Sequence, residues 1–275
     1  MTARPDPPPS GEGLLRRFPA LFLSHGSPMI ALEKEGWGQA LKDFAASIPR
    51  PRAVVVVSGH WEAPVPVRVT ASKAPETIHD FSGFPEQLYR IHYEPLGDPE
   101  LAARVQNLLG RAGIAAALDP RRGLDHGAWV ALRFLYPRAD VPVLEVSQPV
   151  PRTPNDALKI GQALSPLRND GVLLVGTGGI VHNLREVDLA DAAGQVADWA
   201  LAFDAWVASR LEAMDVARLA NYRQSAPYAA LAVPTPDHFD PIFVVLGSAG
   251  PGERVRTIYE GFRYGTLSMR SFAVG

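Results

Sequence analysis

The sequence predicts a single α/β domain with a mostly parallel central sheet that is flanked by helices. Two observations carry this prediction. Short apolar runs alternate along the chain with segments of helical periodicity, and neither an internal repeat nor a clear linker divides the chain. In addition, 275 residues with 47% hydrophobic content are enough to bury a substantial core.

The predicted strands are short runs in which one apolar residue follows another. Strands covered by helices on both faces show this pattern, which is typical of parallel sheets. The candidates are PALFLS (19–24), AVVVVSG (53–59), GIAAALD (113–119), VPVLEVS (141–147) and GVLLVGT (171–177). The tail, residues 254–274, alternates well enough to predict one or two further strands.

Segments of helical periodicity lie between these runs. They cover about 36–48, 98–113, 127–137, 153–169 and 191–213. The second segment opens with Asp98 as a cap and Pro99 at the first helical position, and it closes near Gly110 and Gly113. The alternation of strands and helices indicates one α/β unit.

The beginning of the chain differs in composition. MTARPDPPPSGEG is rich in proline, glycine and polar residues and lacks the apolar segment of a secretory signal, which predicts a disordered lead-in over residues 1–18. No apolar run approaches the roughly 18 to 20 residues that a membrane span requires. We therefore expect a soluble, cytoplasmic protein whose folded domain covers residues 19–275.

Charge and cysteine content exclude several classes of function. Charged residues make up 20% of the chain and the formal net charge is −2, so nucleic acid and anionic membrane are not expected partners. The chain has no cysteine, which excludes disulfides, iron–sulfur clusters, thiolate zinc sites and cysteine nucleophiles. Histidine, aspartate and glutamate remain as metal ligands.

Histidines follow three of the predicted strands, namely His25, His60 and His182. In open α/β sheets, ligands bind outside the carboxyl ends of the strands. The neighbouring glycines let the chain turn so that three neutral imidazoles can share one divalent metal. The sequence therefore predicts a metal site at the strand carboxyl ends, with His238 and His126 as further candidates. For each histidine alone, a surface or hydrogen-bonded loop residue stays the alternative, because the spacing matches no short metal motif.

Six blocks occur in a characteristic order: LFLSHGSPM, SGHWE, TIHDFSGFPEQLY, LDHGAW, GTGGIVHNLR and PTPDHFDPIFVVLG. In this order they resemble the class III extradiol ring-cleaving dioxygenases of the LigB-type superfamily, in particular the 4,5-DOPA extradiol dioxygenase branch. The likeness runs from about Pro19 to the C-terminus. It implies that residues 19–275 form one catalytic α/β domain with a mixed, mostly parallel central sheet and a non-haem metal at the edge of that sheet. Ser82 stands where the family has glycine.

The resemblance also implies roles for individual histidines. His25 and His60 match the two metal-ligating histidines, and His238 matches the third ligand, with Asp237 as the alternative. His182 matches the acid/base catalyst, and whether it also ligates the metal stays open. His126 matches a histidine that contacts a catechol oxygen.

The implied reaction opens the ring of a DOPA-like catechol with O₂, beside the two hydroxyls, to give a semialdehyde. Fe(II) is the expected metal, because electrons must pass from the catecholate to O₂; Zn(II) would bind the same imidazoles and could occupy the isolated protein, but it is redox-inert. A zinc-dependent hydrolase and a non-enzymatic Memo-type binding protein are the alternatives. Arg185 is a candidate partner for a substrate carboxylate, although an exposed arginine is the preferred interpretation. The particular catechol, the bond that is cut and the oligomeric state are left open.

Overall fold

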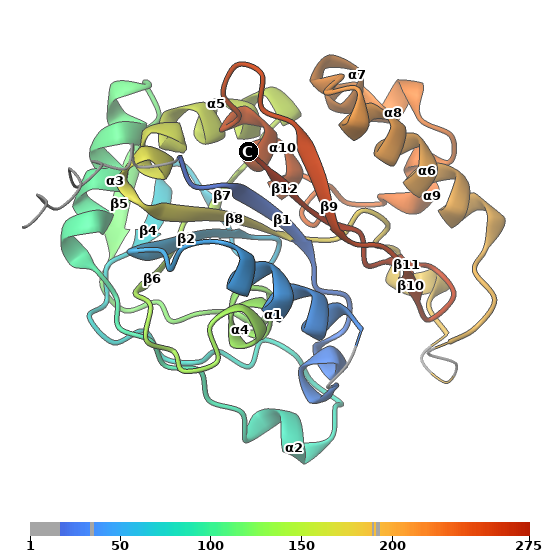
Figure 1. Ribbon diagram of the computed structural model, residues 1–275, viewed down its shortest axis with the longest axis horizontal. Helices are drawn as coiled ribbons and strands as arrows, with labels where there is room; N and C mark the ends of the chain where they lie inside the picture. The colour runs from blue at the N-terminus through green and yellow to red at the C-terminus, as the bar shows by residue number, and fades with distance from the viewer. Residues whose placement is uncertain (1–16, 34–35, 189, 191–192) are drawn as a thin grey trace, which may run out of the picture.

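The computed structural model describes residues 17–33, 36–188, 190 and 193–275, and its centre is a six-stranded sheet (Figure 1). The strand order is β6-β2-β8-β1-β12-β9. The bounds are β1 Ala20–Ser24, β2 Ala53–Ser58, β6 Val143–Glu145, β8 Val172–Gly178, β9 Val255–Tyr259 and β12 Ser271–Val274. The pairs β6–β2, β2–β8 and β8–β1 are parallel, whereas β12 runs antiparallel to both of its neighbours. This arrangement confirms the predicted mixed, mostly parallel sheet.

Three two-stranded ribbons complete the β-structure. They are β3 (Glu62–Pro64) with β7 (Gln148–Val150), β4 (Val67–Thr70) with β5 (Ala116–Asp119), and β10 (Phe262–Arg263) with β11 (Leu267–Ser268). The prediction that 113–119 is a strand buried like the others was wrong in two respects. Only its second half is extended, and it pairs with β4 outside the central sheet, with no fully buried residue.

The long helices lie close to the segments of helical periodicity. They are α1 Trp37–Ser47, α3 Pro99–Arg111, α4 His126–Leu135, α5 Pro154–Leu164 and α6 Asp198–Glu212. The predicted helix over 153–169 changes at Ser165 into the 3₁₀ helix η2 (Ser165–Asp170). The predicted helix over 191–213 was too long at its start, because α6 begins at Asp198; residues 191 and 192 lie outside the described residues.

Shorter helices fill the connections. They are α2 Glu86–Tyr89, α7 Val216–Ala220, α8 Tyr222–Ser225, α9 Ala229–Ala232 and α10 Pro241–Gly247, with the 3₁₀ helices η1 Pro28–Leu32 and η3 Leu184–Glu186. Figure 1 shows α6 to α9 gathered at one end of the molecule, beside β10 and β11.

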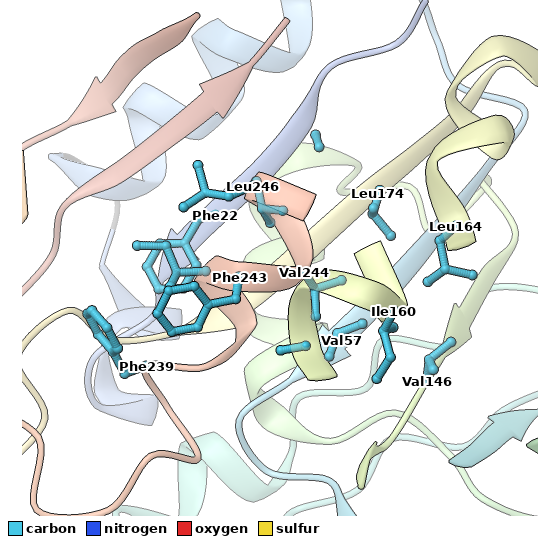
Figure 2. Close-up of a cluster of buried hydrophobic side chains, with 14 of the residues drawn as sticks. Phe22, Val57, Val146, Ile160, Leu164, Leu174, Phe239, Phe243, Val244 and Leu246 are labelled. Carbon is cyan, nitrogen blue, oxygen red and sulfur yellow. The ribbon is translucent and has the colours of Figure 1, made fainter. Parts of the chain in front are cut away.

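Two hydrophobic cores lie on opposite faces of the sheet. Because successive side chains of a strand point to opposite faces, Val54 and Val56 join one core and Val55 and Val57 the other. The first core packs against α1 and α4, and the second against α3, α5, α6 and α10. Figure 2 shows part of the second core, where Phe243 and Val244 of α10 and Ile160 of α5 lie over the sheet. The double coverage explains why the central strands are apolar throughout.

Local sequence fixes the helix starts. Thr153 accepts a hydrogen bond from the Asp156 backbone N–H and Asp156 accepts one in return, a capping box, and Pro154 occupies the first helical position of α5. Asp98 caps α3 by accepting from the Leu101 N–H, as predicted.

The chain is already packed before Pro19. The Phe18 side chain is buried, its N–H donates to the Arg168 carbonyl at 2.9 Å, and Arg17 Nε lies 3.0 Å from Glu253 Oε1. The end of the expected disordered lead-in therefore belongs to the folded part, and residues 1–16 lie outside the described residues. Within the described chain, no helix combines the length and apolar character needed to cross a membrane.

Helix α5 packs against α10 through glycine. A Cβ at Gly161 would lie 2.0 Å from the Val244 carbonyl oxygen. We expect Gly161→Ala to lower the free energy of unfolding by about 1–3 kcal/mol, because the helices must separate. Chemical denaturation would measure this change. Gly110→Ala in α3 is the matched control, since no other heavy atom outside its own helix lies within 4 Å of the added Cβ. The control should gain about 0.5–1 kcal/mol, and equal effects at the two positions would contradict this view of the contact.

Candidate metal centre

Two of the predicted ligands are placed by the register of the central sheet. Strand β8 pairs with β1 so that Ser24 lies opposite Gly178, and with β2 so that Ser58 lies opposite Thr177. The His25 N–H then donates to the Gly178 carbonyl at 3.1 Å, just beyond the end of β1. His60 follows β2 by two residues, and the ring centroids of His25 and His60 are 5.0 Å apart.

His238 reaches the same edge from the loop that precedes α10. Its carbonyl oxygen accepts a hydrogen bond from the Gly179 N–H at 2.9 Å. The backbone can come this close only because Gly178 has no side chain, since a Cβ there would lie 2.0 Å from the same carbonyl oxygen. The His238 ring centroid is 4.6 Å from that of His60 and 5.4 Å from that of His25.

His126 is the first residue of α4, where Asp125 is the N-cap. Gly127 lets the start of this helix touch the strand end, because a Cβ there would meet Ser58 Oγ at 2.6 Å and the His60 ring at 2.9 Å. The ring centroids of His126 and His60 are 3.9 Å apart.

His182 lies four residues beyond β8, and its N–H donates to the Ala232 carbonyl at 2.9 Å. Its ring stacks on that of His238 with a centroid separation of 3.6 Å and an interplanar angle of 5°. The structure thus brings together all five histidines that the sequence singled out, from five separate parts of the chain. Their individual roles stay predictions.

Each predicted ligand has an oxygen acceptor beside its Nδ1. His25 Nδ1 is 3.2 Å from the Gly26 carbonyl, His60 Nδ1 is 3.5 Å from Asp80 Oδ2, and His238 Nδ1 is hydrogen-bonded to Asp237 Oδ2. Such partners are typical of metal-ligating histidines, because a proton held on Nδ1 leaves the Nε2 lone pair free.

The Nε2 atoms fit a metal ion. His25 Nε2 is buried and has no hydrogen-bond partner among the described residues, which is costly for a polar atom unless a ligand completes it. The Nε2 atoms of His60 and His238 lie 3.1 Å apart. That separation allows both to bind one ion at the roughly 2.1 Å typical of imidazole–metal bonds.

Other ligand sets share this small volume. The ligand atoms of His25, His60 and His126 lie within 4.8 Å of one another, and so do those of His182, Asp237 and His238. The Asp237 carboxylate is engaged with His238 Nδ1. This contact favours His238 over Asp237 as the third ligand, with Asp237 orienting the imidazole.

Burial keeps the imidazoles neutral. Loss of solvation, followed by repulsion from neighbouring histidines, lowers the pKa of His25 well below its ordinary value and that of His238 to about 3. The same loss of solvation lowers the pKa of His60 and of His182 to about 4. Neutral imidazole is the form that binds metal, so the site is prepared for a cation at neutral pH.

Asp80 serves two histidines at once. Its Oδ1 accepts the His126 backbone N–H at 2.9 Å and lies 3.0 Å from His126 Nδ1, while Oδ2 faces His60. Burial would raise the pKa of Asp80, but its hydrogen bonds with His126 and its attraction to His126 and His60 together outweigh burial and bring the pKa to about 2. Asp80 was not predicted to belong to the site, although it lies in the TIHDFSGFP block. Nothing local in the sequence indicates that it would meet histidines 20 and 46 residues away.

A buried network of polar side chains supports the histidines. Ser58 Oγ accepts from the His60 N–H at 3.1 Å and donates to Asp125 Oδ1 at 2.7 Å, and the Asp125 N–H donates to Glu145 Oε1 at 2.9 Å. Burial, and then the charge of Asp125, raise the pKa of Glu145 well above its ordinary value. This network ties the ends of β2 and β6 to the start of α4, and so fixes His60 relative to His126.

Four of the five histidines line one side of a pocket of about 350 Å³, and this side is called the floor of the pocket. His60, His126, His182 and His238 line it, and most of its remaining walls are apolar. Arg185, the candidate for a substrate carboxylate, is exposed and is not among the described residues that line the pocket.

Comparison with known proteins gives consistent results. Residues 19–274 match the family described as the catalytic LigB subunit of aromatic ring-opening dioxygenase. A 4,5-DOPA dioxygenase extradiol of Beta vulgaris is 38% identical over 260 residues, which cover 91% of this chain and 94% of the relative. One from Escherichia coli K12 is 39% identical over 263 residues, covering 94% and 95%.

A solved structure shares the fold. The crystal structure of an uncharacterized protein from Escherichia coli K12 superposes with a TM-score of 0.81 at 35% sequence identity, covering 94% of this chain and all of that one (100%). The predicted fold and the resemblance stated from the sequence are both confirmed.

The contact between His238 Nδ1 and the Asp237 carboxylate gives a test of the ligand assignment. We expect Asp237→Asn to weaken Zn(II) binding about 10–100-fold, because the neutral amide orients and polarises the imidazole less well. Titration of the protein against a chromophoric chelator measures this affinity. Asp43→Asn, an exposed position on α1, is the matched control. If Asp237 were the ligand instead, His238→Ala would leave the affinity almost unchanged.

The neutral imidazoles also predict how the stability of the metal-free protein depends on pH. Four pKa values, those of His25, His60, His182 and His238, are lowered in the folded state. Below the unfolded value of about 6.5, the unfolded chain therefore takes up protons that the folded chain resists. The free energy of unfolding should fall as the pH is lowered from about 6.5 to 4.

Two buried carboxyl groups act in the opposite direction. Burial raises the pKa of Asp240 to about 6 and that of Glu145 well above its ordinary value, so these groups favour the folded state as the pH falls. Because four imidazoles outnumber two carboxyl groups, the free energy of unfolding should still fall as the pH is lowered. Denaturant titrations at several pH values would measure it, and His182→Gln should reduce the slope. A stability that is flat or rising over this pH range would contradict the prediction.

Proposed function

Because the chain belongs to the LigB family of aromatic ring-opening dioxygenases, we propose that it is an extradiol dioxygenase that opens a catechol ring beside its two hydroxyls. The observation that carries the proposal is the meeting of His25, His60 and His238. Each has an oxygen atom within 3.5 Å of its Nδ1, their ring centroids lie 4.6 to 5.4 Å apart, and the Nε2 atoms of His60 and His238 are 3.1 Å apart. An enzyme of this class is an oxidoreductase with a small-molecule substrate and O₂ as co-substrate.

His25, His60 and His238 are proposed to hold the metal, for which Fe(II) fits the reaction. When bound, Fe(II) supplies a redox-active centre with coordination positions left open for catecholate and O₂. Zn(II) would bind the same three imidazoles without supporting electron transfer. The protein contributes three neutral imidazoles, two of which, His60 and His238, line the pocket that would admit catechol and O₂.

His182 is proposed as the acid/base group. It is neutral at pH 7, because burial lowers its pKa to about 4, and it stacks on a proposed ligand at the pocket floor. One ring nitrogen of His182 can accept the proton that a catechol hydroxyl loses on binding. The resulting imidazolium, with its lowered pKa, is then a good acid that returns the proton during ring opening.

His126 is proposed to contact a catechol oxygen. Its ring lines the pocket and is held by Asp80 at Nδ1, which leaves Nε2 for the substrate. Asp80 thus positions His126 and His60 together, so a catechol held between them has a fixed orientation. Phe81 lies edge-on to the His126 ring with a centroid separation of 5.5 Å and closes one side of the pocket.

The overall reaction balances without a further reductant. The bond between a hydroxyl-bearing ring carbon and its unhydroxylated neighbour breaks. One oxygen atom of O₂ becomes part of the new carboxyl group and the other becomes the aldehyde oxygen. The catechol supplies all four electrons that reduce O₂, and the product is a ring-opened semialdehyde.

Oxygen uptake tests the proposal. The apoprotein is loaded anaerobically with Fe(II), mixed with a panel of catechols and then exposed to O₂. We expect one O₂ consumed per catechol and a yellow product. His182→Gln should lower kcat about 100-fold or more, because proton transfer is lost, while Zn(II) affinity stays within a few-fold.

His92→Gln is the control for that variant, because the His92 side chain is 64% exposed and lies outside the pocket. It should keep full turnover. If no catechol in a broad panel consumes O₂, the dioxygenase proposal is wrong, and hydrolysis by a zinc-bound water becomes the better use of the same imidazoles. If His182→Gln keeps full activity, the acid/base assignment fails while the reaction stands.

A further inference from the structure

The pocket has two chemically different ends. The imidazoles form the floor, and the walls beyond them are made by apolar side chains from four parts of the chain. These residues are Pro28, Phe81, Phe84, Leu184, Val187 and Leu267. Phe81 and Phe84 meet edge-to-face, with ring centroids 5.4 Å apart and an interplanar angle of 83°. A catechol bound by its hydroxyls at the floor would direct its substituent toward this apolar wall.

Charged partners for a substituent are missing among the described residues that line the pocket. None of them is a lysine or an arginine, and Asp80 is the one carboxylate. Both Asp80 oxygens face His126 and His60, so this carboxylate lies at the imidazole end of the pocket. The two serines of the lining, Ser27 and Ser82, are uncharged, and Ser27 Oγ accepts a hydrogen bond from the Met29 N–H at 3.3 Å.

The rim of the pocket extends the apolar wall. Leu184 lines the pocket although 65% of the residue is exposed. It begins η3, and the next residue, Arg185, is exposed and does not line the pocket. An exposed leucine at this position offers a substrate an apolar contact but cannot pair with a charged substituent.

Resting on the function proposed above, we propose that the preferred substrates are catechols whose ring substituent is uncharged and apolar, such as an alkyl or aryl group. A zwitterionic side chain, as in DOPA, would give up hydration of its ammonium and carboxylate groups without gaining a charged partner. An alkyl or aryl group instead gains burial against Phe81, Phe84 and Leu184.

A series of catechols with matched ring positions tests this inference. The compounds are 4-ethylcatechol, 3-(3,4-dihydroxyphenyl)propanoate, dopamine and DOPA, whose substituents are neutral, anionic, cationic and zwitterionic. For the Fe(II)-loaded protein, kcat/KM from oxygen uptake should be at least tenfold higher for 4-ethylcatechol than for any of the other three. Calorimetric titration of the Zn(II)-loaded protein, which does not turn over, should give the same order of affinity.

The two measurements separate this inference from the proposed function. Turnover of several catechols with DOPA equal to or better than 4-ethylcatechol would overturn the inference and leave the dioxygenase proposal intact. Absence of turnover, combined with tenfold tighter binding of 4-ethylcatechol, would overturn the proposed function and keep the preference of the pocket. Absence of both turnover and binding would overturn both.

A rim variant tests the role of Leu184 directly. Leu184→Arg places a cation at the pocket entrance, and it should raise kcat/KM for the anionic propanoate at least fivefold relative to 4-ethylcatechol. Leu184→Gln is the matched control, because it is polar and of similar reach but uncharged. It removes the same apolar contact, so it should raise that ratio less than half as much as Leu184→Arg does. Because the residue is largely exposed, both variants are expected to fold. Equal ratios in the two variants would show that Leu184 does not face the substituent.

Discussion

The close approach of the His238 loop to the end of β8 is the contact on which the site depends. Strand β8 pairs with both β1 and β2, so its end fixes the positions of His25 and His60. The His238 carbonyl then lies against Gly178, where a single methyl group would collide with it. A sheet of larger residues would still form at this edge, but it would hold the third imidazole away from the other two.

The same buried geometry explains the electrostatics of the pocket. Crowded imidazoles repel protons, and their Nδ1 atoms are held by a carbonyl and by the carboxylates of Asp80 and Asp237. A cation at the centre would relieve this crowding, because it replaces repulsion between neighbouring rings with attraction for their lone pairs. The site therefore favours a metal over a proton. The Ser58–Asp125–Glu145 network beneath it resists the movement that would otherwise let the rings spread apart.

Much of this arrangement could be predicted from the sequence, for identifiable reasons. Strands β1, β2, β6 and β8 are covered on both faces, so their apolar runs stand out, and histidines beyond three carboxyl ends meet by topology alone. The segment around β5 was wrongly predicted to be a buried strand, because a partly exposed strand of a two-stranded ribbon also contains apolar residues. The contacts of Asp80 with His60 and His126 could not be predicted, because they depend on the path of a loop that no local sequence pattern determines. The stacking of His182 on His238 depends in the same way on the loop after β8.

Floor and wall of the pocket are held by different parts of the fold. The floor is anchored by strand ends and a helix start, where backbone hydrogen bonds and glycine contacts leave little freedom. Much of the wall lies on connections, with Phe81 and Phe84 before α2 and with Leu184 and Val187 in and after η3. Substitutions at these wall positions do not change the sheet register that places His25 and His60. The ring-opening reaction and the preference for a ring substituent can therefore vary independently among members of the family. Membership of the family indicates the reaction, whereas the preferred substituent has to be inferred from the residues that form the pocket wall in each member.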